Sequence, residues 1–261
     1  MQTTQETIYL HRSTDKKLRW LDPISQSPCT VEMAAAGYLR INGWWVSFRY
    51  DPILMAILLS AMFDQIKISD KEHKEIIDDV LLGGPRTREM AELREKSKQK
   101  LLGKGLSSYE QQRIELHERL VEVAKQKAPE QLERNLKKIL PRAEKHFMER
   151  WRKAWRGSYR LDETIIWGDM PVKDEKVSRS LYLVKELGVC RLVSAIQEQY
   201  EATKFVGWPD LLAWREGAAC FFEVKSKNDR LQGTQEKVLE VLDRNEIDAK
   251  VLNVLDEEDA K

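Results

Sequence analysis

Apolar residues recur at helical spacing in two stretches near the N-terminus, one on each side of an aromatic run. Residues 31–41, VEMAAAGYLRI, predict a short amphipathic helix that Asn42 and Gly43 bring to an end. The following WWVSFRY, residues 44–50, has the aromatic and β-branched residues typical of a strand. Asp51 before Pro52 is typical of an N-cap and a first-turn proline, which predicts a second helix through the apolar residues 53–63.

The middle of the chain has a different pattern, with many charged residues and sparse leucines three or four positions apart. This pattern runs from about residue 67 to residue 156 and predicts a set of charged helices. Glycine-rich breaks at 83–85 and 102–108 interrupt it, and Pro129 and Pro141 mark further helix starts or kinks.

The last third alternates helical and strand-like patterns. Helices are predicted at 176–187, 190–202 and 234–244, and strands at 210–214, 218–224 and 249–254. The first two strands are joined by the short turn REG, so we expect them to form an antiparallel hairpin. This order predicts an α/β architecture, a small mixed sheet flanked by helices.

Composition narrows the classes of function. The 261 residues, 42% hydrophobic and 33% charged, are enough to bury a sizeable core, and 44 basic against 43 acidic side chains leave a net charge of +1. The chain as a whole has too little positive charge to attract an anionic polymer, so any nucleic-acid binding has to depend on a local cluster of basic residues. The three cysteines lack CxxC spacing, which argues against a disulfide framework or a zinc knuckle.

The location predicted from the sequence is cytoplasmic. The N-terminus lacks the apolar segment of a secretion signal, and the longest apolar stretch, residues 53–62, is too short to span a bilayer. We therefore expect no membrane partner, and an intracellular protein that acts in the cytoplasm, at the nucleoid or in a phage-infected cell.

Two carboxylates and a lysine in the predicted hairpin carry the candidate chemistry. Asp210 begins the first strand, Glu223 lies near the end of the second, and twelve residues separate them. Two antiparallel strands joined by a short turn bring the start of one beside the end of the other, so both carboxylates reach one edge of the sheet. Alternation along the strand places Glu223 and Lys225 on the same face and turns Val224 into the core.

Such an edge is suited to a hard divalent cation. Mg²⁺ or Mn²⁺ prefers oxygen ligands, which Asp210, Glu223 and the backbone carbonyl of Val224 supply, and Lys225 lies where it can orient a water or offset charge on a phosphorane. Taken alone, a strand that ends in Glu-Val-Lys is more often a surface ion pair.

The surrounding residues favour the metal site. The string GWPDLLAWREGAACFFEVKSKNDRLQGTQEKVLEVL, residues 207–242, resembles the virus-type replication-repair nuclease (VRR-Nuc) branch of the PD-(D/E)XK superfamily. The resemblance is strongest over about residues 190–254. Residues 190–211 and the long helical stretch before them also resemble the larger Fanconi-associated nuclease version of the domain.

The resemblance implies roles for individual residues. Asp210, Glu223 and Lys225 are expected to be the metal-binding and catalytic residues, with Gln235 close to them on the next helix. The family also draws a carboxylate from an upstream helix, for which the sequence offers Asp51, slightly preferred, or Glu32. An ordinary N-cap and a solvated helix residue are the respective alternatives for these two side chains.

Basic residues supply candidate contacts to DNA. Lys227 and Arg230 follow the proposed metal site, and Arg152 and Arg156 belong to a basic segment at 142–160 in which aromatic residues recur every four positions. Phosphate contacts give affinity that depends on salt, and an exposed ring stacks on an unpaired base. In the alternative interpretation the rings face the core and the basic residues are merely solvated.

These inferences predict a restriction-endonuclease-like fold with three segments. Residues 1–66 form the N-terminal helices of the core, 67–156 a charged helical insertion and 157–261 the catalytic core. The predicted function is a Mg²⁺- or Mn²⁺-dependent deoxyribonuclease acting on branched, flapped or junction DNA, and because of the insertion a monomer is favoured over a homodimer. The alternative is a non-catalytic module that binds DNA or docks a protein through the charged helices.

Overall fold

The computed structural model describes two compact parts of the chain. The described residues are 4–15, 19–62, 118, 121–123, 125–154, 164–169, 171–203 and 207–260. Residues 1–50 and 162–261 form the first unit, and residues 51–161 form the second.

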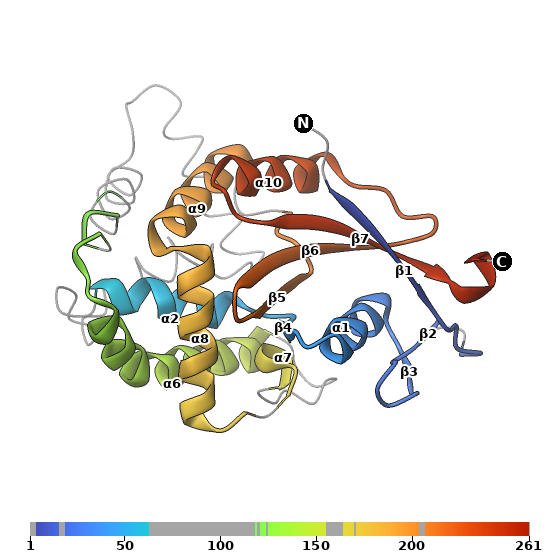
Figure 1. The fold of residues 1–261 in the computed structure, drawn as a ribbon, viewed down its shortest axis with the longest axis horizontal. Coiled ribbons are helices and arrows are strands. Elements are labelled where there is room, and N and C mark those ends of the chain that lie inside the picture. The colour runs from blue at the N-terminus through green and yellow to red at the C-terminus, as the bar shows by residue number, and fades with distance from the viewer. Residues whose placement is uncertain are drawn as a thin grey trace. The chain divides into compact units, whose positions relative to one another are not determined.

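A five-stranded mixed sheet is the centre of the first unit (Figure 1). Its order is β1 (Gln5–Leu10), β7 (Ala249–Asp256), β6 (Ala218–Ser226), β5 (Leu211–Arg215) and β4 (Trp45–Ser47). β1 and β6 run parallel to β7, whereas β5 is antiparallel to both β6 and β4. The central strand β6 is buried along most of its length, as expected for a strand with neighbours on both sides and helices on both faces.

Helices cover the two faces of this sheet. On one face α1 (Val31–Ile41) packs Ala35 and Leu39 into a core shared with Phe222 and Val224 of β6. On the other face the Trp214 indole donates a hydrogen bond to the Arg179 carbonyl oxygen of α8 (Lys173–Leu187), at 2.8 Å. α9 (Val189–Thr203) and α10 (Gly233–Arg244) pack together, and α10 links β6 to β7. The remaining elements of this unit are α7 (Thr164–Trp167), β2 (Trp20–Leu21), β3 (Pro28–Cys29) and η1 (Glu257–Ala260).

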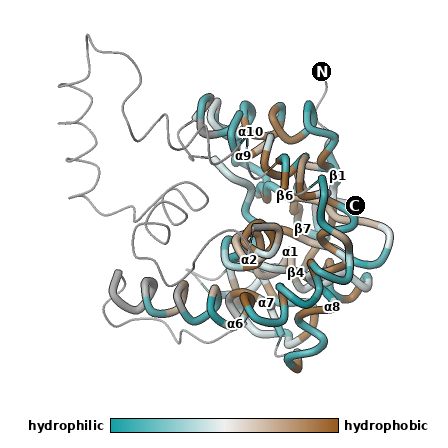
Figure 2. Tube along the Cα trace, turned by 90° about the vertical axis from the view of Figure 1, so that its left-hand side faces the viewer, coloured by the Kyte–Doolittle hydropathy of each residue, from teal (hydrophilic) through white to brown (hydrophobic). Residues whose placement is uncertain are grey.

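The second unit is described through two helices, α2 (Asp51–Met62) and α6 (Pro129–Ala154). Apolar colour dominates α2 in Figure 2, and nearly all its residues are buried, whereas α6 alternates polar and apolar positions. The Asn135 side chain of α6 donates to the Ser60 carbonyl oxygen at 2.8 Å and so joins the two helices. Among the residues described, no helix is long and apolar enough to cross a membrane.

The predicted α/β class is confirmed, with differences at the ends of elements. The helix at 31–41 and the hairpin of β5 and β6 are confirmed, and β6 extends to Ser226, beyond the predicted end. The strand predicted over 44–50 is shorter, because only Trp45–Ser47 pair with β5. Pro129 starts α6 as predicted, and Pro141 lies within that helix. The breaks predicted at 83–85 and 102–108 lie outside the described residues.

Candidate active site

The β5–β6 hairpin brings Asp210 beside Glu223. Leu211 pairs with Phe222 in the antiparallel register. Asp210, the residue before Leu211, therefore lies opposite Glu223, the residue after Phe222. The Val224 backbone N–H donates to Asp210 Oδ2 at 2.9 Å and holds this carboxylate against β6. The sequence prediction that a hairpin joins these two carboxylates at one edge of the sheet agrees with this geometry.

Lys225 and Gln235 complete a network around Glu223. Lys225 Nζ donates to Glu223 Oε1 at 2.6 Å and to Gln235 Oε1 at 3.1 Å, and Gln235 Nε2 donates to the same Glu223 oxygen. Gln235 lies in the first turn of α10, where its side-chain oxygen also accepts from the Gln232 N–H at 2.9 Å. The start of the helix therefore fixes the amide that holds the lysine and the glutamate.

Burial raises the pKa of both carboxyls in this network. Glu223 is 1% exposed and Lys225 9% exposed, while Val224 packs into the core of the α1 face as the alternation predicts. Burial and the neighbouring Asp210 carboxylate raise the pKa of Glu223 to about 7, although the Lys225 ammonium opposes the shift. Burial also raises the pKa of Asp210, against the lowering effect of the Val224 N–H. When both carboxyls are ionised, their two negative charges face only one positive charge, that of the Lys225 ammonium, so the site has excess negative charge.

One oxygen of this site has no hydrogen-bond donor. In its ionised form Glu223 has no donor to Oε2 among the described residues, whereas Oε1 accepts from both Lys225 and Gln235. The adjacent Asp210 carboxyl shares a hydrogen bond with Glu223 only when one of the two is protonated. An unsatisfied buried carboxylate oxygen is unfavourable unless a cation or a donor completes it. Within the described ranges, no three His, Cys, Asp or Glu side chains lie together as a metal cluster, so the candidate site consists of the Asp210–Glu223 pair. The donor set, oxygen from two carboxylates, suits a hard divalent cation.

The two upstream candidates fall in different units. Glu32 lies in the first turn of α1, whose N-cap Thr30 accepts a hydrogen bond from the Met33 N–H at 3.4 Å. Among the influences on Asp210, after burial and the Val224 N–H, the negative charge of Glu32 raises the pKa of the Asp210 carboxyl. Asp51 belongs to the second unit and is the first residue of α2. The sequence predicted it as the N-cap that precedes this helix, whereas the structure includes it in the helix.

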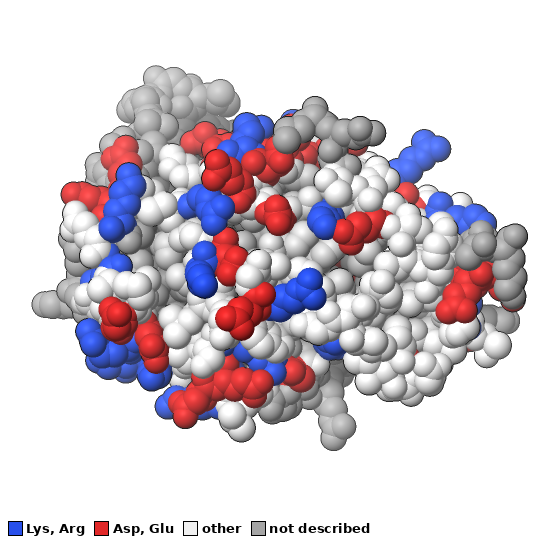
Figure 3. Space-filling model, in the orientation of Figure 1, with Lys and Arg blue, Asp and Glu red and all other residues white. Residues whose placement is uncertain are grey.

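The basic residues proposed for DNA contacts differ in what the structure describes. Lys227 and Arg230 are exposed in the loop after β6, where Asp229 accepts hydrogen bonds from the Ser226 N–H and hydroxyl. Arg152 lies in α6, but its side chain is outside the described set, as are Arg156 and the aromatic residues between 151 and 159. Over the face drawn in Figure 3, basic and acidic side chains of the described residues are interspersed.

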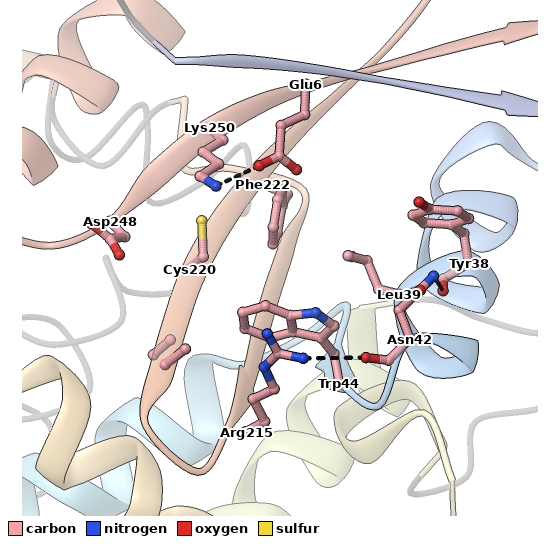
Figure 4. Close-up of a pocket in the computed structure, with 12 residues that line it drawn as sticks. Glu6, Tyr38, Leu39, Asn42, Trp44, Arg215, Cys220, Phe222, Asp248 and Lys250 are labelled. Carbon is pink, nitrogen blue, oxygen red and sulfur yellow. Dashed lines mark hydrogen bonds and ion pairs between the residues drawn. The ribbon is translucent and has the colours of Figure 1, made fainter.

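Apart from the Asp210–Glu223 site, a cavity that we call the second cavity lies on the α1 side of the sheet, near the start of β6 (Figure 4). It has a volume of about 410 Å³, and three of its charged groups, Lys250, Glu6 and Arg215, already have partners. Lys250 pairs with Glu6, and the Arg215 guanidinium lies 4.4 Å from the Trp44 ring centroid. Burial raises the pKa of the Cys220 thiol there to about 12, so this thiol stays protonated and unreactive. The candidate chemistry therefore belongs to the Asp210–Glu223 edge.

No pattern in the sequence indicated the residues that hold the segment before Asp210. The Tyr50 hydroxyl donates to the Pro209 carbonyl oxygen at 2.8 Å, across 159 positions of the chain. Tyr50 was predicted only as the end of a strand, and a long-range contact of this kind leaves no periodic signal. The Gly207-Trp208-Pro209 string that precedes the aspartate was the one visible sign that this backbone is constrained.

The hairpin, the paired carboxylates and the adjacent lysine are the arrangement expected from the sequence resemblance to the PD-(D/E)XK superfamily. Within it, residues 144–256 match the family model of the VRR-NUC domain. The predicted resemblance to this family is confirmed over these residues, and the match begins upstream of the part in which the sequence resemblance is strongest. A search of characterised protein sequences gave no significant match.

Several solved structures share the fold, among them two of the same protein. They are crystal structures of paFAN1 bound to 5′-flap DNA with a gap, one with a 2-nt flap and one with a 1-nt flap. The first has a TM-score of 0.52 at 15% identity over 97% of this chain, and the second 0.50 at 14% over 97%. The chain spans only 37% and 38% of the length of those proteins. At this identity the likeness concerns the fold alone.

Proposed function

We propose that this protein is a divalent-metal-dependent, structure-selective deoxyribonuclease that hydrolyses phosphodiester bonds in flapped or branched DNA. The observation that supports this most is the buried Glu223, whose Oε2 lacks a donor while Asp210, Lys225 and Gln235 surround the rest of the carboxylate. The VRR-NUC domain is a nuclease domain, and the similar paFAN1 structures hold flap DNA, which supports the choice of substrate class.

Asp210 and Glu223 would hold the cation, either Mg²⁺ or Mn²⁺, together with the Val224 carbonyl oxygen as the sequence predicts. Such a cation supplies Lewis-acid activation of water and of the scissile phosphate. The Lys225 ammonium has three N–H donors, and the described residues accept from two of them. The third can orient the attacking water or donate to a phosphate oxygen as negative charge develops there.

Glu32 is our proposal for an upstream carboxylate that acts on Asp210 through its charge, since within the described ranges no third carboxylate joins Asp210 and Glu223 as a metal ligand. Its charge acts on Asp210 within the same unit, which supports this assignment over the slightly preferred Asp51 of the sequence prediction. Glu32→Ala is expected to weaken metal-dependent cleavage by about 10- to 100-fold, more than Asp51→Ala does. Intact cleavage in Glu32→Ala, measured at limiting Mg²⁺, would remove Glu32 from the site.

Lys227 and Arg230 are our proposed contacts to the DNA backbone near the scissile phosphate, and Arg152 and Arg156, in the basic segment at 142–160, remain predicted contacts. Removing the charge that binds one phosphate is expected to lower the slope of log K against log salt by about one. Fluorescence anisotropy with flap DNA over a series of salt concentrations measures that slope for each lysine or arginine variant.

A cleavage assay tests the proposed activity. Wild-type protein is expected to cut a synthetic 5′ flap or four-way junction with Mg²⁺ and to be inactive in EDTA. Lys225→Ala is expected to cut about 100- to 1000-fold more slowly, because the charge next to the phosphate is removed. Lys250→Ala is the matched control, since that lysine pairs with Glu6 at the second cavity.

Cleavage that persists in EDTA, or that Lys225→Ala leaves unchanged, would contradict a metal-dependent nuclease. Tight binding of flap DNA with no cleavage under any metal would instead favour the non-catalytic binding module. We also propose that the protein is a monomer, which light scattering tests. A cytoplasmic location is a further proposal, which cell fractionation tests.

A further inference from the structure

The segment that leads into Asp210 lies against the first turn of α10. Gly207 has φ of +90°, and a Cβ built on it would lie 2.8 Å from the Thr234 carbonyl oxygen and 3.1 Å from the Gln235 backbone nitrogen. Only glycine combines this φ with so close an approach of two backbones. The segment that leads into Asp210 therefore lies against the same helical turn that carries Gln235.

Tyr50 holds the next peptide of this segment. Its side chain is buried, with 5% of the residue exposed, and its hydroxyl donates to the Pro209 carbonyl oxygen at 2.8 Å. That carbonyl belongs to the peptide plane whose nitrogen is that of Asp210. The hydrogen bond thus restrains the backbone immediately before the Asp210 side chain, which Val224 N–H holds on its other side.

The Tyr50 ring is held by packing that does not involve its hydroxyl. Its centroid lies 5.2 Å from that of Phe221 and 6.4 Å from that of Trp208, both in edge-to-face geometry. Trp208 and Phe221 also contact each other, with centroids 5.5 Å apart. A phenylalanine at position 50 keeps these ring contacts, so Tyr50→Phe removes the hydrogen bond to Pro209 and leaves the packing of the ring in place.

We propose that Tyr50 is a positioning residue for the metal site: its hydroxyl orients the Pro209–Asp210 peptide so that the Asp210 carboxylate meets the cation held with Glu223. The inference rests on the proposed function. Octahedral coordination tolerates small displacements of a ligand poorly, and removal of a partner that orients a metal ligand commonly changes metal affinity. No direct contact of Tyr50 with substrate or cation is required.

Binding of Mn²⁺ to the full chain, followed by the EPR signal of the free ion, tests this role without relying on activity. Tyr50→Phe is expected to raise the Mn²⁺ dissociation constant by about 3- to 10-fold. The Mg²⁺ concentration for half-maximal cleavage should rise by a similar factor, while the KM for flap DNA at saturating metal stays within about twofold of wild type. Tyr182→Phe, which removes a phenol hydroxyl from a ring packed on Trp45, is the matched control and should behave as wild type.

The outcomes separate the inference from the proposed function. If wild type binds Mn²⁺ and Tyr50→Phe binds it equally well, the hydroxyl has no positioning role, even if the melting temperature falls. If wild type itself binds no Mn²⁺, the metal-dependent function fails and the role of Tyr50 fails with it. All variants are measured at a temperature at which circular dichroism shows them folded.

Discussion

The sheet of the first unit contains two lysine–glutamate pairs in different surroundings. Lys225 and Glu223 lie 2.6 Å apart with side chains only 11% and 2% exposed, whereas the side chains of Lys250 and Glu6 are 32% and 44% exposed. The hydrogen bond from Lys250 to Glu6 raises the pKa of that lysine, as expected for a partly solvated ion pair. At Glu223, burial outweighs its lysine and the pKa of the carboxyl rises instead.

This difference shows how burial changes what the same two side chains do. A solvated pair contributes about 0–1 kcal/mol to stability and leaves no group unsatisfied. The buried pair, with Asp210 beside it and Glu223 Oε2 lacking a donor, is unfavourable without additional positive charge. The following predictions depend on this shortage of positive charge, which exists at the buried pair and not at the solvated one.

Replacing the glutamate of each pair should give the largest contrast in cleavage. Glu223→Gln keeps acceptors for Lys225 and Gln235 but removes a charged oxygen from the cation, so flap cleavage is expected to fall by about 1000-fold or more. Glu6→Gln should leave the rate within about twofold, because Glu6 lies at the second cavity. Equal reductions in the two variants, measured as single-turnover rates, would contradict the comparison.

Gln235 should have an intermediate effect on cleavage. Gln235→Ala removes the acceptor and donor that join Lys225 and Glu223, and a reduction of about 10- to 100-fold in rate is expected. The neighbouring exposed Glu236 offers a matched control in the same turn of α10, since Glu236→Ala leaves the network intact. A rate for Gln235→Ala equal to that of this control would show that the amide does not orient the lysine.

The raised pKa of Glu223 should be detectable in the absence of DNA, as a pH dependence of the free energy of unfolding that Glu223→Gln lacks. The pKa of Glu223 rises from 4.5 to about 7 on folding, so the folded protein retains a proton that the unfolded chain has released. The contribution of this group to stability is therefore fully present below its unfolded pKa and is lost as pH rises through about 7. In EDTA, wild type is expected to lose about 1 to 3 kcal/mol between about pH 5 and pH 8 that Glu223→Gln does not lose.

Urea denaturation at each pH measures this difference. Parallel stability profiles for wild type and Glu223→Gln would show that the carboxyl is not strained in the metal-free protein. Addition of Mn²⁺ at the higher pH is expected to restore stability to wild type and not to the variant, because the ion binds the folded state alone.

The smallest effect is expected at the solvated pair. Lys250→Ala should change the free energy of unfolding by about 1 kcal/mol or less, and the change should shrink further at high salt, where exposed charges are screened. A larger destabilisation that is insensitive to salt would mean that Lys250 supports the sheet by packing and not by charge.

The parts of the site that could be predicted from the sequence are those with local patterns. Asp210, Glu223 and Lys225 occur in two strand-like runs joined by a short turn, and the register of such a hairpin follows from its loop. Gln235 followed from the family resemblance. The helix at 31–41 had both a periodic pattern and a stop signal, and its observed bounds agree.

Long-range pairings left no such signal. β1 was not predicted, since QETIYL has little alternation and its partner β7 lies at the other end of the chain. The predicted strand at 44–50 was too long because only three of its residues pair with β5, and Tyr50 instead turns its hydroxyl to Pro209. The effect of Glu32 on Asp210 likewise depends on how α1 packs on the sheet, which its own sequence does not encode.

A crystal of the protein soaked in Mn²⁺ and measured at the manganese absorption edge tests the metal site most directly. We predict an anomalous peak about 2.1 to 2.3 Å from oxygens of both Asp210 and Glu223, with Glu223 Oε2 among its ligands. The Lys225 ammonium should remain beside Glu223 in that crystal. Carboxylates that point apart, with no peak between them, would contradict the proposed metal site.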